Sequence, residues 1–530
     1  MPDAAPNLAT KPPVEQPAAD TGPARTGSSK TLLAAVLLGC LIVPTGVSGT
    51  GVALPAIAAD TGATAATLQW VVNAFNLAFA CSTLLAGSLA DLFGRKRTFM
   101  AGAGTFLAAA VLSATTTSIV LLDIARALAG IGAAAIFSCG GALLATNFEG
   151  KSQLRAFAFM GTAAGLGLGL GPTISGLLID RLGWQTIFVF NAVGIGIVLI
   201  LVAIARSAPE TLRHEASIDT PGSTTFVGGL LLLIFAIVQG GVWGWAAPGT
   251  LALLAVGVVL LAVFVAVERR REHPMFDFSV LRDRRMVGLI MVPVTASFGF
   301  VTLLTYLPTY MSTAWGDSVG TAGLKMLVMT IPIVIAPVLA GWIAQRGVAP
   351  RHILACSLLF FVIGPAWLLV IGPQASLLSV AVPMVLIGAG FGLGVGLVDG
   401  EALRLVSPEK SGMASGLVNT ARLGSEAIAV AIYGALLTTF TASKITDSVH
   451  RAAGSGADPH EIADQVSTGK ITEAAAHAPA AHRADFAHSL ITGYDAALHT
   501  MLWVLVAVGA VLTVLVIRLL RPTASTAPTS

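Results

Sequence analysis

The chain has 530 residues, of which 55% are apolar and only 11% are charged. A soluble globular protein carries about a quarter of its residues as charged side chains. This composition excludes a mostly water-facing surface and predicts that lipid surrounds most of the protein. The net charge of +3 gives no indication of a nucleic-acid partner, because the basic residues are confined to predicted loops.

The N-terminal residues 1–29 are rich in Ala, Pro, Thr and Ser and contain almost no large apolar side chains. Such a segment cannot bury enough surface to become ordered, so we expect a disordered cytoplasmic tail. The first apolar run starts after Lys30 and is too long for the core of a signal peptide. It is therefore predicted to be a retained membrane span.

Apolar windows of about 20 residues are long enough to cross a bilayer as a helix. They predict an all-α polytopic membrane protein with fourteen spans. These spans lie near residues 31–57, 68–90, 98–117, 119–146, 156–179, 184–206, 223–241, 249–267, 287–312, 321–344, 352–372, 376–403, 412–438 and 495–519.

The distribution of the 30 lysines and arginines supports this count. With both termini in the cytoplasm, most of these cations fall on cytoplasmic segments, and Arg181 alone falls on a short outer loop. Cytoplasmic loops of membrane proteins carry such an excess of cations. One span more or fewer would reverse half of the loops and destroy the asymmetry.

Three segments are expected to lie outside the membrane. Residues 207–222 are a polar cytoplasmic linker, and residues 268–286 are a basic cytoplasmic loop. Residues 439–494 form a long, Ala-rich and polar outer loop, with helical patterns around 459–466 and 474–489. Most of the histidines lie in or near this loop, at no spacing typical of a metal site. We expect a solvated loop.

The four cysteines all fall within apolar runs, which predicts buried and inert thiols. They show neither a disulfide framework nor a metal-ligand spacing. We expect no metal, no cofactor and no enzyme, since the sequence also lacks a nucleotide loop and a set of nucleophile and base. The cysteines are Cys40, Cys81, Cys139 and Cys356.

A short charged stretch separates the second and third predicted spans. It reads Gly-Ser-Leu-Ala-Asp-Leu-Phe-Gly-Arg-Lys-Arg from Gly87 to Arg97, which indicates a cytoplasmic hairpin. This stretch resembles the loop signature of the major facilitator superfamily. Asp91 stands at the C-terminal end of a helix, which is unfavourable for an anion without a partner. The resemblance implies a conformational latch against a later span near Gly412, made of Gly87, Asp91, Gly94, Arg95, Lys96 and Arg97.

A second motif lies inside the fifth predicted span, where glycine occurs at every other position before Pro172. A dinucleotide-binding loop would need a preceding strand and a soluble βαβ unit, which this apolar span excludes. Small residues let helices approach closely in lipid, and proline can kink a span. The motif resembles the antiporter signature of the superfamily's fifth span, through Gly165, Gly169, Gly171, Pro172 and Gly176.

Further matches extend the resemblance from about residue 50 to 435, and together they are similar to the fourteen-span drug:proton antiporter branch. They are Leu54-Pro55, the stretch 68–72, the stretch from Arg126 to Gly132, the stretch 184–191 and the stretch 415–424. The resemblance implies two six-helix bundles at 30–206 and 287–520. Residues 207–286, with two extra helices, would join the bundles, and 521–530 would form a cytoplasmic tail.

Two pairs of opposite charges lie within spans, where ionisable groups are costly and either pair or face a cavity. Asp123 and Arg126 are three residues apart, and Arg422 and Glu426 are four apart. Both spacings place the two side chains on the same helix face. Mutual neutralisation and a role in proton coupling are both open.

Asp399 and Glu401 lie two residues apart in the twelfth predicted span, with no cation nearby until Arg404. Two neighbouring, poorly solvated carboxylates resist ionising together, so one of them could hold a proton. A simple position near the membrane interface explains them equally well. Lys325 lies near the outer end of the tenth span and is expected to extend its ammonium group to the interface.

One departure from the branch concerns the first span. Aligned on the Val-Ala-Leu-Pro stretch that ends at Pro55, Gly46 and Gly51 occupy the positions of the branch's Asp and Asn. The carboxylate usually implicated in proton coupling is therefore absent. Either another acid, such as Asp123, Asp399 or Glu401, carries the proton, or the coupling differs.

The resemblance implies a secondary exporter of amphipathic organic compounds such as antibiotics, dyes or secondary metabolites, with proton antiport by alternating access. A uniporter, a differently coupled exporter and a non-transporting membrane protein are the alternatives. The expected setting is a monomer in a bacterial cell membrane, with protons and lipid as its other partners. The cavity is predicted to be apolar and lightly polar, lined by Trp70, Asn73, Phe75, Asn76, Asn191 and Asn419.

Overall fold

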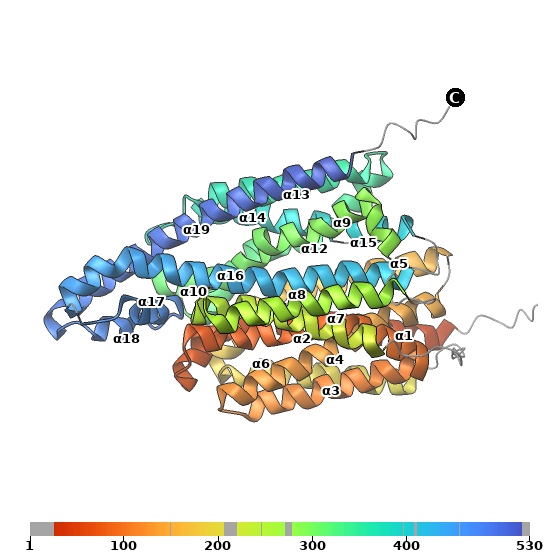
Figure 1. The fold of residues 1–530 in the computed structure, drawn as a ribbon, viewed down its shortest axis with the longest axis horizontal. Helices are drawn as coiled ribbons and strands as arrows, with labels where there is room; N and C mark the ends of the chain where they lie inside the picture. The colour runs from red at the N-terminus through yellow and green to blue at the C-terminus, as the bar shows by residue number, and fades with distance from the viewer. Residues whose placement is uncertain are drawn as a thin grey trace, which may run out of the picture.

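The computed structural model describes residues 26–148, 150–205, 220–244, 246–270, 278–395, 397–406, 411–454 and 456–521. These residues form helices joined by short connections, and the long helices run side by side along one axis (Figure 1). The predicted N-terminal tail up to residue 25 and almost all of the predicted linker lie outside the described residues.

The N-terminal half of the protein, called the N-half below, contains six helices that match the first six predicted spans. In this half α1 packs against α5 and α6, while α4 packs against α2 and α3. The helices are α1 (Thr26–Thr61), α2 (Ala65–Phe93), α3 (Arg95–Thr115), α4 (Ile119–Asn147), α5 (Gly150–Leu182) and α6 (Gln185–Ile204).

A hairpin of two helices, α7 (Thr220–Trp243) and α8 (Pro248–Glu268), follows the N-half. α7 packs against α2 and α16, and α8 packs against α7. Much of the surface of α8 is exposed and apolar, as at Val258 and Val259, which are 57% and 58% exposed. Exposed aliphatic surface of this kind suits contact with lipid.

The C-terminal half, or C-half, contains helices at the remaining predicted spans, but three of these spans are broken. A π-helical turn, η2 (Ser297–Val301), separates α9 from α10 one turn after Pro293, which lacks a backbone N–H. The elements are η1 (Phe278–Arg282), α9 (Arg284–Ala296), α10 (Thr302–Ala314), α11 (Val319–Lys325), α12 (Leu327–Gln345), α13 (Pro350–Leu368), α14 (Leu377–Gly394), α15 (Leu397–Arg404), α16 (Ser411–Ala453) and α19 (Arg483–Leu519).

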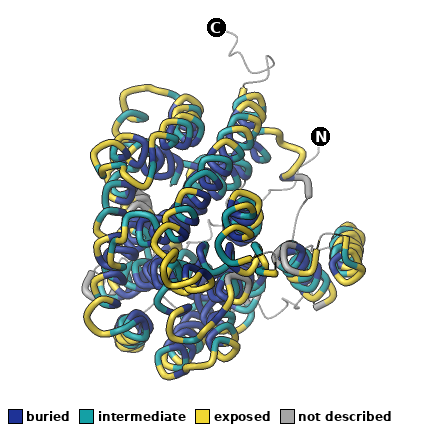
Figure 2. The backbone as a smooth tube through the Cα atoms, turned by 90° about the vertical axis from the view of Figure 1, so that its left-hand side faces the viewer, coloured by how far each residue is buried: buried dark blue, intermediate teal, exposed yellow. Residues whose placement is uncertain are grey.

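Twelve helices or helix pairs among the described residues are long and apolar enough to cross a membrane. α2 and α7 are not among these twelve, although they contain 29 and 24 residues and lie at predicted spans. Figure 2 shows buried residues between the helices and exposed residues around the outside of the bundle. The predicted membrane-embedded helical class is therefore confirmed, while the count of fourteen spans stays a prediction.

The predicted solvated loop at 439–494 is instead a folded extension of the C-half, which we call the cap. α16 and α19 continue into it without a break, and α17 (Pro459–Ser467), α18 (Ile471–Ala476) and η4 (Ala480–His482) lie between them (Figure 1). The extension of α16 buries Ala442, Ile445 and Val449, which recur at helical spacing. This apolar stripe explains why the segment folds rather than remaining solvated.

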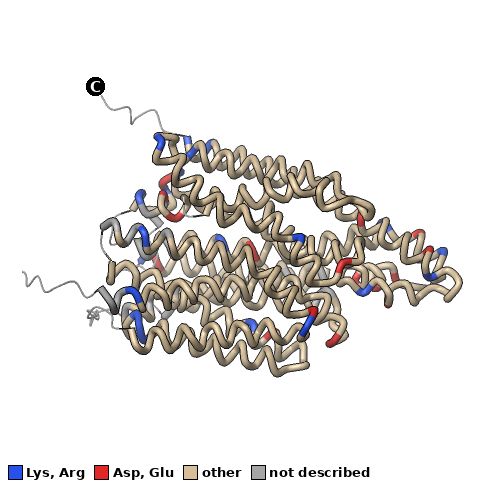
Figure 3. Tube along the Cα trace, turned by 180° about the vertical axis from the view of Figure 1, so that it is seen from behind, with Lys and Arg blue, Asp and Glu red and all other residues tan. Residues whose placement is uncertain are grey.

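Charge distinguishes the two ends of the bundle. Most of the described lysines and arginines lie at the end where the described chain starts and finishes, and the cap lies at the other end (Figure 3). We call these the basic end and the cap end. The cysteine prediction holds for three of the four thiols, whereas Cys356 is exposed on the surface of α13.

Candidate functional site

The glycine-rich helix α5 forms a seam between the two halves. Its glycines lie on two faces: Gly171 faces α1, whereas Gly169 and Gly176 face α12 and α11. A Cβ atom on Gly169 would lie 3.1 Å from the backbone oxygen of Thr330, and one on Gly176 would lie 2.8 Å from that of Val319. Glycine is therefore what allows these backbones to touch.

The other motif residues fit the same arrangement. Gly165 faces Ile333 of α12, and the backbone oxygen of Pro172 would lie 2.6 Å from a Cβ atom on Gly323 of α11. Thr173, next along α5, donates a hydrogen bond to the oxygen of Gly323 over 3.0 Å. The predicted motif helix thus packs against the C-half along several turns.

A carboxylate that the sequence analysis did not single out joins the halves at the cap end. Oδ2 of Asp180, at the end of α5, accepts hydrogen bonds from the backbone N–H of Gly320 (3.0 Å) and from the hydroxyl of Ser318 (2.9 Å). Both donors belong to the first turn of α11, where an anion is favourable. In the sequence, only Ser318, a typical N-cap residue, could have indicated this contact. Its partner Asp180 lies 138 residues earlier, so the sequence does not show that the two residues meet.

The charged hairpin at the basic end has the predicted tight turn. Gly94 joins α2 to α3 with φ of 96°, a backbone conformation that favours glycine. Arg95 donates to the backbone oxygen of Ala142 over 3.4 Å, and Lys96 donates to that of Ala205 over 2.6 Å. Ala142 lies in the last turns of α4, and Ala205 directly follows α6. Cations are favourable near the C-terminal end of a helix.

The predicted latch joins Asp91 to the start of α16 near Gly412. The side chains at both places lie outside the described part of the chain. A Cβ atom on Gly87 would meet the hydroxyl oxygen of Ser138 of α4 at 3.4 Å. Gly87 thus borders a helix of its own half, while α2 packs along both α4 and α16, and the role of Gly87 in the latch stays a prediction.

Arg126 is the largest charged group in the described interior of the N-half, and 2% of it is exposed. Its Nε donates to the backbone oxygen of Val71 over 2.9 Å, and its guanidinium carbon lies 4.5 Å from the centre of the Phe75 ring. Arg126 and Asp123 form no direct hydrogen bond with each other. Arg126 Nη2 and Asp123 Oδ1 are both buried without a hydrogen-bond partner among the described protein atoms.

Three asparagines of the N-half are also buried, each no more than 1% exposed. Within the described part of the chain, neither amide atom of Asn73 or Asn76 has a partner, and Oδ1 of Asn191 has none. An unsatisfied buried amide is costly, so these groups require water or a ligand. A Cβ atom on Gly46 would lie 2.6 Å from Nδ2 of Asn191, so the glycine leaves room for this amide.

The two aromatic residues expected to line the cavity have other neighbours. Trp70 lies 5.0 Å from Phe235 of α7 between ring centres and donates to the side chain of Gln239 over 3.4 Å. Phe75 packs beneath Arg126 in the interior of the N-half. Trp70 therefore contacts the additional hairpin rather than the asparagines, because α7 covers this face of α2.

In the C-half, Arg422 forms an ion pair with Asp399 rather than with Glu426. Nη2 lies 3.2 Å from both carboxylate oxygens of Asp399, and Nη1 donates to Oδ1 of Asn419 over 2.8 Å. The expectation that Asp399 lacks a cation is therefore wrong, since α15 packs on α16. The pair borders a small cavity between α9, α13 and α14.

Glu401 and Glu426 have contrasting surroundings. Glu401 pairs with Arg404 over 2.8 Å at the surface, where the arginine side chain is 75% exposed. Glu426 is 9% exposed and forms no hydrogen bond or ion pair with the described residues. Its neighbour Ser425 bonds to Ser297 of the π turn over 2.8 Å between hydroxyl oxygens. Of the acids predicted in the C-half, Glu426 is thus the buried one that forms no direct hydrogen bond with the described residues.

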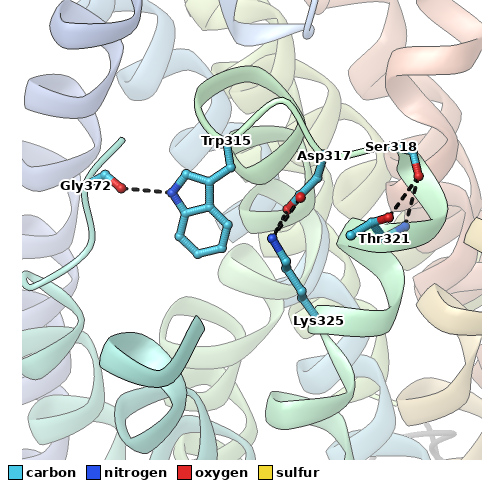
Figure 4. A network of polar contacts seen from close by, with 6 residues as sticks. All are labelled: Trp315, Asp317, Ser318, Thr321, Lys325 and Gly372. Atoms are coloured by element: carbon cyan, nitrogen blue, oxygen red, sulfur yellow. Dashed lines mark hydrogen bonds and ion pairs between the residues drawn. The ribbon is translucent and has the colours of Figure 1, made fainter. Parts of the chain in front are cut away.

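Lys325 extends its ammonium group to the turn between α10 and α11 at the cap end. Its ammonium nitrogen lies 2.8 and 2.5 Å from the two carboxylate oxygens of Asp317 and 4.7 Å from the centre of the Trp315 ring (Figure 4). The indole N–H of Trp315 in turn donates to the oxygen of Gly372 over 2.8 Å. The turn between α10 and α11 supplies the partner, and the cluster joins it to the loop after α13.

A second cluster at this end was not anticipated. The hydroxyl of Tyr310 donates to the carboxylate of Asp495, and Nε2 of His499 lies 2.9 Å from the oxygen of Leu369. His499 thereby contacts the end of α13, where carbonyl groups lack helical partners. We assign this cluster to the folding of the C-half.

Two helical halves that meet along α5, with additional helices beside them, define a polytopic membrane transporter. The Major Facilitator Superfamily model matches residues 36–430, and this chain belongs to that superfamily.

Relatives in other bacteria match most of the chain. Multidrug resistance protein Stp of Mycobacterium tuberculosis is 30% identical over 418 residues, which are 78% of this chain and 76% of that protein. The probable actinorhodin transporter of Streptomyces coelicolor is 32% identical over 414 residues, 76% of this chain and 71% of that protein. Puromycin resistance protein pur8 of Streptomyces alboniger is 30% identical over 402 residues, 75% and 79% of the two chains.

Solved structures show the same fold at low sequence identity. A bacterial homologue of the human lysosomal transporter Spinster, inward-facing and unoccupied, aligns with a TM-score of 0.61 at 15% identity and covers 94% of this chain and 100% of that one. An auto-inhibited peptide transporter of the POT family aligns with a TM-score of 0.59 at 15% identity, covering 84% and 96%. The predicted major-facilitator fold is thus confirmed.

Proposed function

We propose that this protein is a fourteen-span exporter of amphipathic organic compounds that works by alternating access and is coupled to protons. The basic end would face the cytoplasm, since cytoplasmic loops carry the excess of cations. The cap would then lie outside the cell membrane. The names of the relatives support export, since they include a multidrug resistance protein, a puromycin resistance protein and an actinorhodin transporter.

The observation that carries this proposal is the seam along α5. Its glycines touch α1 on one face and α11 and α12 on another, and Asp180 joins the halves at the cap end. Such an interface without bulky side chains suits two bodies that rock against each other, as alternating access requires. In this proposal, the contacts at the cap end would correspond to a state closed toward the outside.

The binding site would lie among the buried amides of the N-half. Asn73, Asn76 and Asn191 offer donors and acceptors that the described residues leave unused, in a mostly apolar setting. A few polar groups in an apolar pocket suit amphipathic molecules. Asn419, already bonded to Arg422, would take part only if that contact opened.

Glu426 and Asp123 are the preferred proton carriers. A carboxylate inside a bundle without a partner is costly, which is why such groups mark proton pathways in transporters. Asp399 and Glu401, which both have arginine partners, are weaker candidates. Gly46 beside Asn191 favours the second candidate function, a uniporter or differently coupled exporter, because an amide occupies the space near the missing acid.

The latch at the basic end remains part of the proposal. Asp91→Asn should leave the protein inserted but slow export, because the second helix would lose the charge that holds it in the outward-open state. Normal export at equal expression would remove the latch from the mechanism.

Accumulation of a panel of antibiotics and dyes, ethidium included, in an efflux-deficient bacterial host tests the function. Lower accumulation in expressing cells is expected for at least one amphipathic compound. Proton movement across proteoliposome membranes on addition of that compound then separates antiport from uniport. No change for any compound across a broad panel would favour a non-transporting membrane protein.

A further inference from the structure

The cap is built as part of the C-half. α17 packs mainly against α16 and also against α19 and α10, with a small contact to α2 of the N-half, and α18 packs against α19. α17 buries one complete apolar face, formed by Ile462, Ala463 and Val466, each 0% exposed. The two helical extensions also pack closely, since a Cβ atom on Gly493 of α19 would collide with Ile445 of α16. A body held by such continuous apolar packing moves with the half to which it belongs.

The turn after α17 reaches across to the N-half. The ammonium group of Lys470 donates to the backbone oxygen of Ala63, in the connection between α1 and α2, over 3.4 Å. Gly469 has φ of 85°, and a Cβ atom there would lie 3.2 Å from Cβ of Pro55 in α1. This turn therefore rests on the end of α1 through one flexible side chain and one small contact surface.

A small cavity lies directly beneath this turn. It is lined by both halves and by the cap, so that three parts of the protein enclose it. Its walls carry several hydroxyl and amide groups, and they include Leu54, Gln69, Tyr306, Thr438, Ser467 and Thr468. The cavity lies at the cap end, between α1 and α2 of the N-half and α10 and α16 of the C-half.

We propose that the turn at Thr468–Lys470 is an outer gate, and that the cavity beneath it is the last chamber on the exit path of the exported compound. This inference rests on the proposed export function. When the halves separate at the cap end, the cap moves with the C-half, and the contacts of Gly469 and Lys470 with the N-half break. The hydroxyl and amide groups in its otherwise apolar walls would then bring water to the leaving compound.

Cross-linking tests the gate directly. In a Cys356→Ser background, which removes the exposed thiol, Ala63→Cys and Lys470→Cys are joined with a short, reducible thiol cross-linker. We expect ethidium export to fall at least about tenfold, since alternating access requires this contact to open. Reduction of the cross-link should restore export. Export at the uncross-linked rate after complete cross-linking would overturn the gate.

A matched pair controls for the chemistry. Arg483 donates to the backbone oxygen of Ala478 over 3.2 Å, so this pair also joins a long cationic side chain to an alanine carbonyl, but wholly within the cap. Cross-linked Ala478→Cys with Arg483→Cys should export within about twofold of the uncross-linked protein, because no moving contact is bridged. If both cross-linked pairs lost export equally, the loss would result from a more rigid cap, and the gate would be overturned.

A labelling experiment does not depend on export. The Ala63→Cys substitution alone, in the same background, should give a thiol that reacts slowly with a membrane-impermeant maleimide, because Ala63 is 7% exposed. Adding Lys470→Gln should increase the labelling rate several-fold by weakening the closed state. An unchanged rate would contradict the gate even if export is normal. The two proposals can also fail separately. If the parent exports no compound but the Lys470→Gln variant is labelled faster, the proposed function is refuted, while the opening of this contact is supported.

Discussion

Charged side chains within the two halves are satisfied in different ways. In the N-half, Arg126 and Asp123 lie three residues apart without a direct hydrogen bond between them, and the nearby asparagine amides have no partner among the described residues. In the C-half, Arg422 pairs with Asp399, and Lys325 pairs with Asp317. Glu426 is the exception among the predicted acids of the C-half.

This difference indicates which groups stabilise the fold and which are available to bind a proton or a ligand. A paired charge has its partner at all times, and separating the two is costly. An unpaired buried group is costly until water, a proton or a ligand satisfies it. The N-half would therefore bind and release, while most interior charges of the C-half would hold its helices together.

Replacing Arg126 tests the proposed role of the N-half and should give the largest loss of export. We expect Arg126→Ala and Arg126→Lys each to reduce export by more than about tenfold, because neither keeps both the bond to Val71 and the flat contact with Phe75. Ethidium efflux from energised cells at equal membrane levels measures this. Arg351→Ala, an exposed cation at the basic end, is the control and should behave as the parent. Parental export by Arg126→Lys would show that only the charge is needed.

Glu426→Gln should separate transport from coupling. We expect export driven by a proton gradient to fall by about tenfold while downhill movement of the compound continues, since the amide cannot exchange a proton. Proteoliposomes with and without an imposed pH gradient give both rates. Glu401→Gln is the matched control, because a surface ion pair contributes about 0–1 kcal/mol. Equal losses in the two variants would remove Glu426 as the carrier.

Gly176→Ala should test the seam with an intermediate effect. The added methyl group would meet Val319 and Gly320 of α11. Overpacking of this kind costs about 1 kcal/mol or more, which is about fivefold in the population of the state closed at the cap end. We expect a comparable loss of export. Gly161→Ala on the same helix has open space around it and should be neutral. Similar export by both alanine variants would mean that the seam tolerates separation.

Asp399→Asn should have the smallest effect and should act on stability. The pair with Arg422 is partly exposed, with 36% and 22% of the two side chains accessible, so its loss should cost about 1 kcal/mol. Thermal unfolding of the purified protein in detergent measures this. The double variant Asp399→Asn with Arg422→Met should be closer to the parent than the single one. A large loss of export without loss of stability would instead place Asp399 in the proton pathway.

The sequence predicted those features that depend on local composition. The positions of the helices follow from apolar windows, and the tight turn at Gly94 follows from its place between two spans. The sequence also predicted that α5 packs closely against its neighbours, because small residues such as glycine let helix backbones approach each other in lipid. Gly169 and Gly176 lie where backbones touch.

The pairing of charges could not be predicted in the same way. Helical spacing pointed Arg422 toward Glu426, but Asp399 lies 23 residues earlier and approaches only when α15 packs on α16. Arg126 likewise turns toward α2 rather than toward its own helix. The helix predicted around 459–466 is confirmed by α17. The packing of the cap was not predicted, because its polar, alanine-rich sequence hides an apolar stripe that is buried only when α16 and α19 meet.

The lengths of α16 and α19 carry one more consequence. At 1.5 Å per residue the 43 residues of α16 extend about 65 Å, roughly twice the hydrocarbon thickness of a bilayer. If the cap lies outside the cell, its tip stands well clear of the lipid headgroups. The exposed turn at Gly454 is then accessible to an antibody on living cells. An epitope inserted there would report the amount and the orientation of the protein at the cell surface without disturbing any helix.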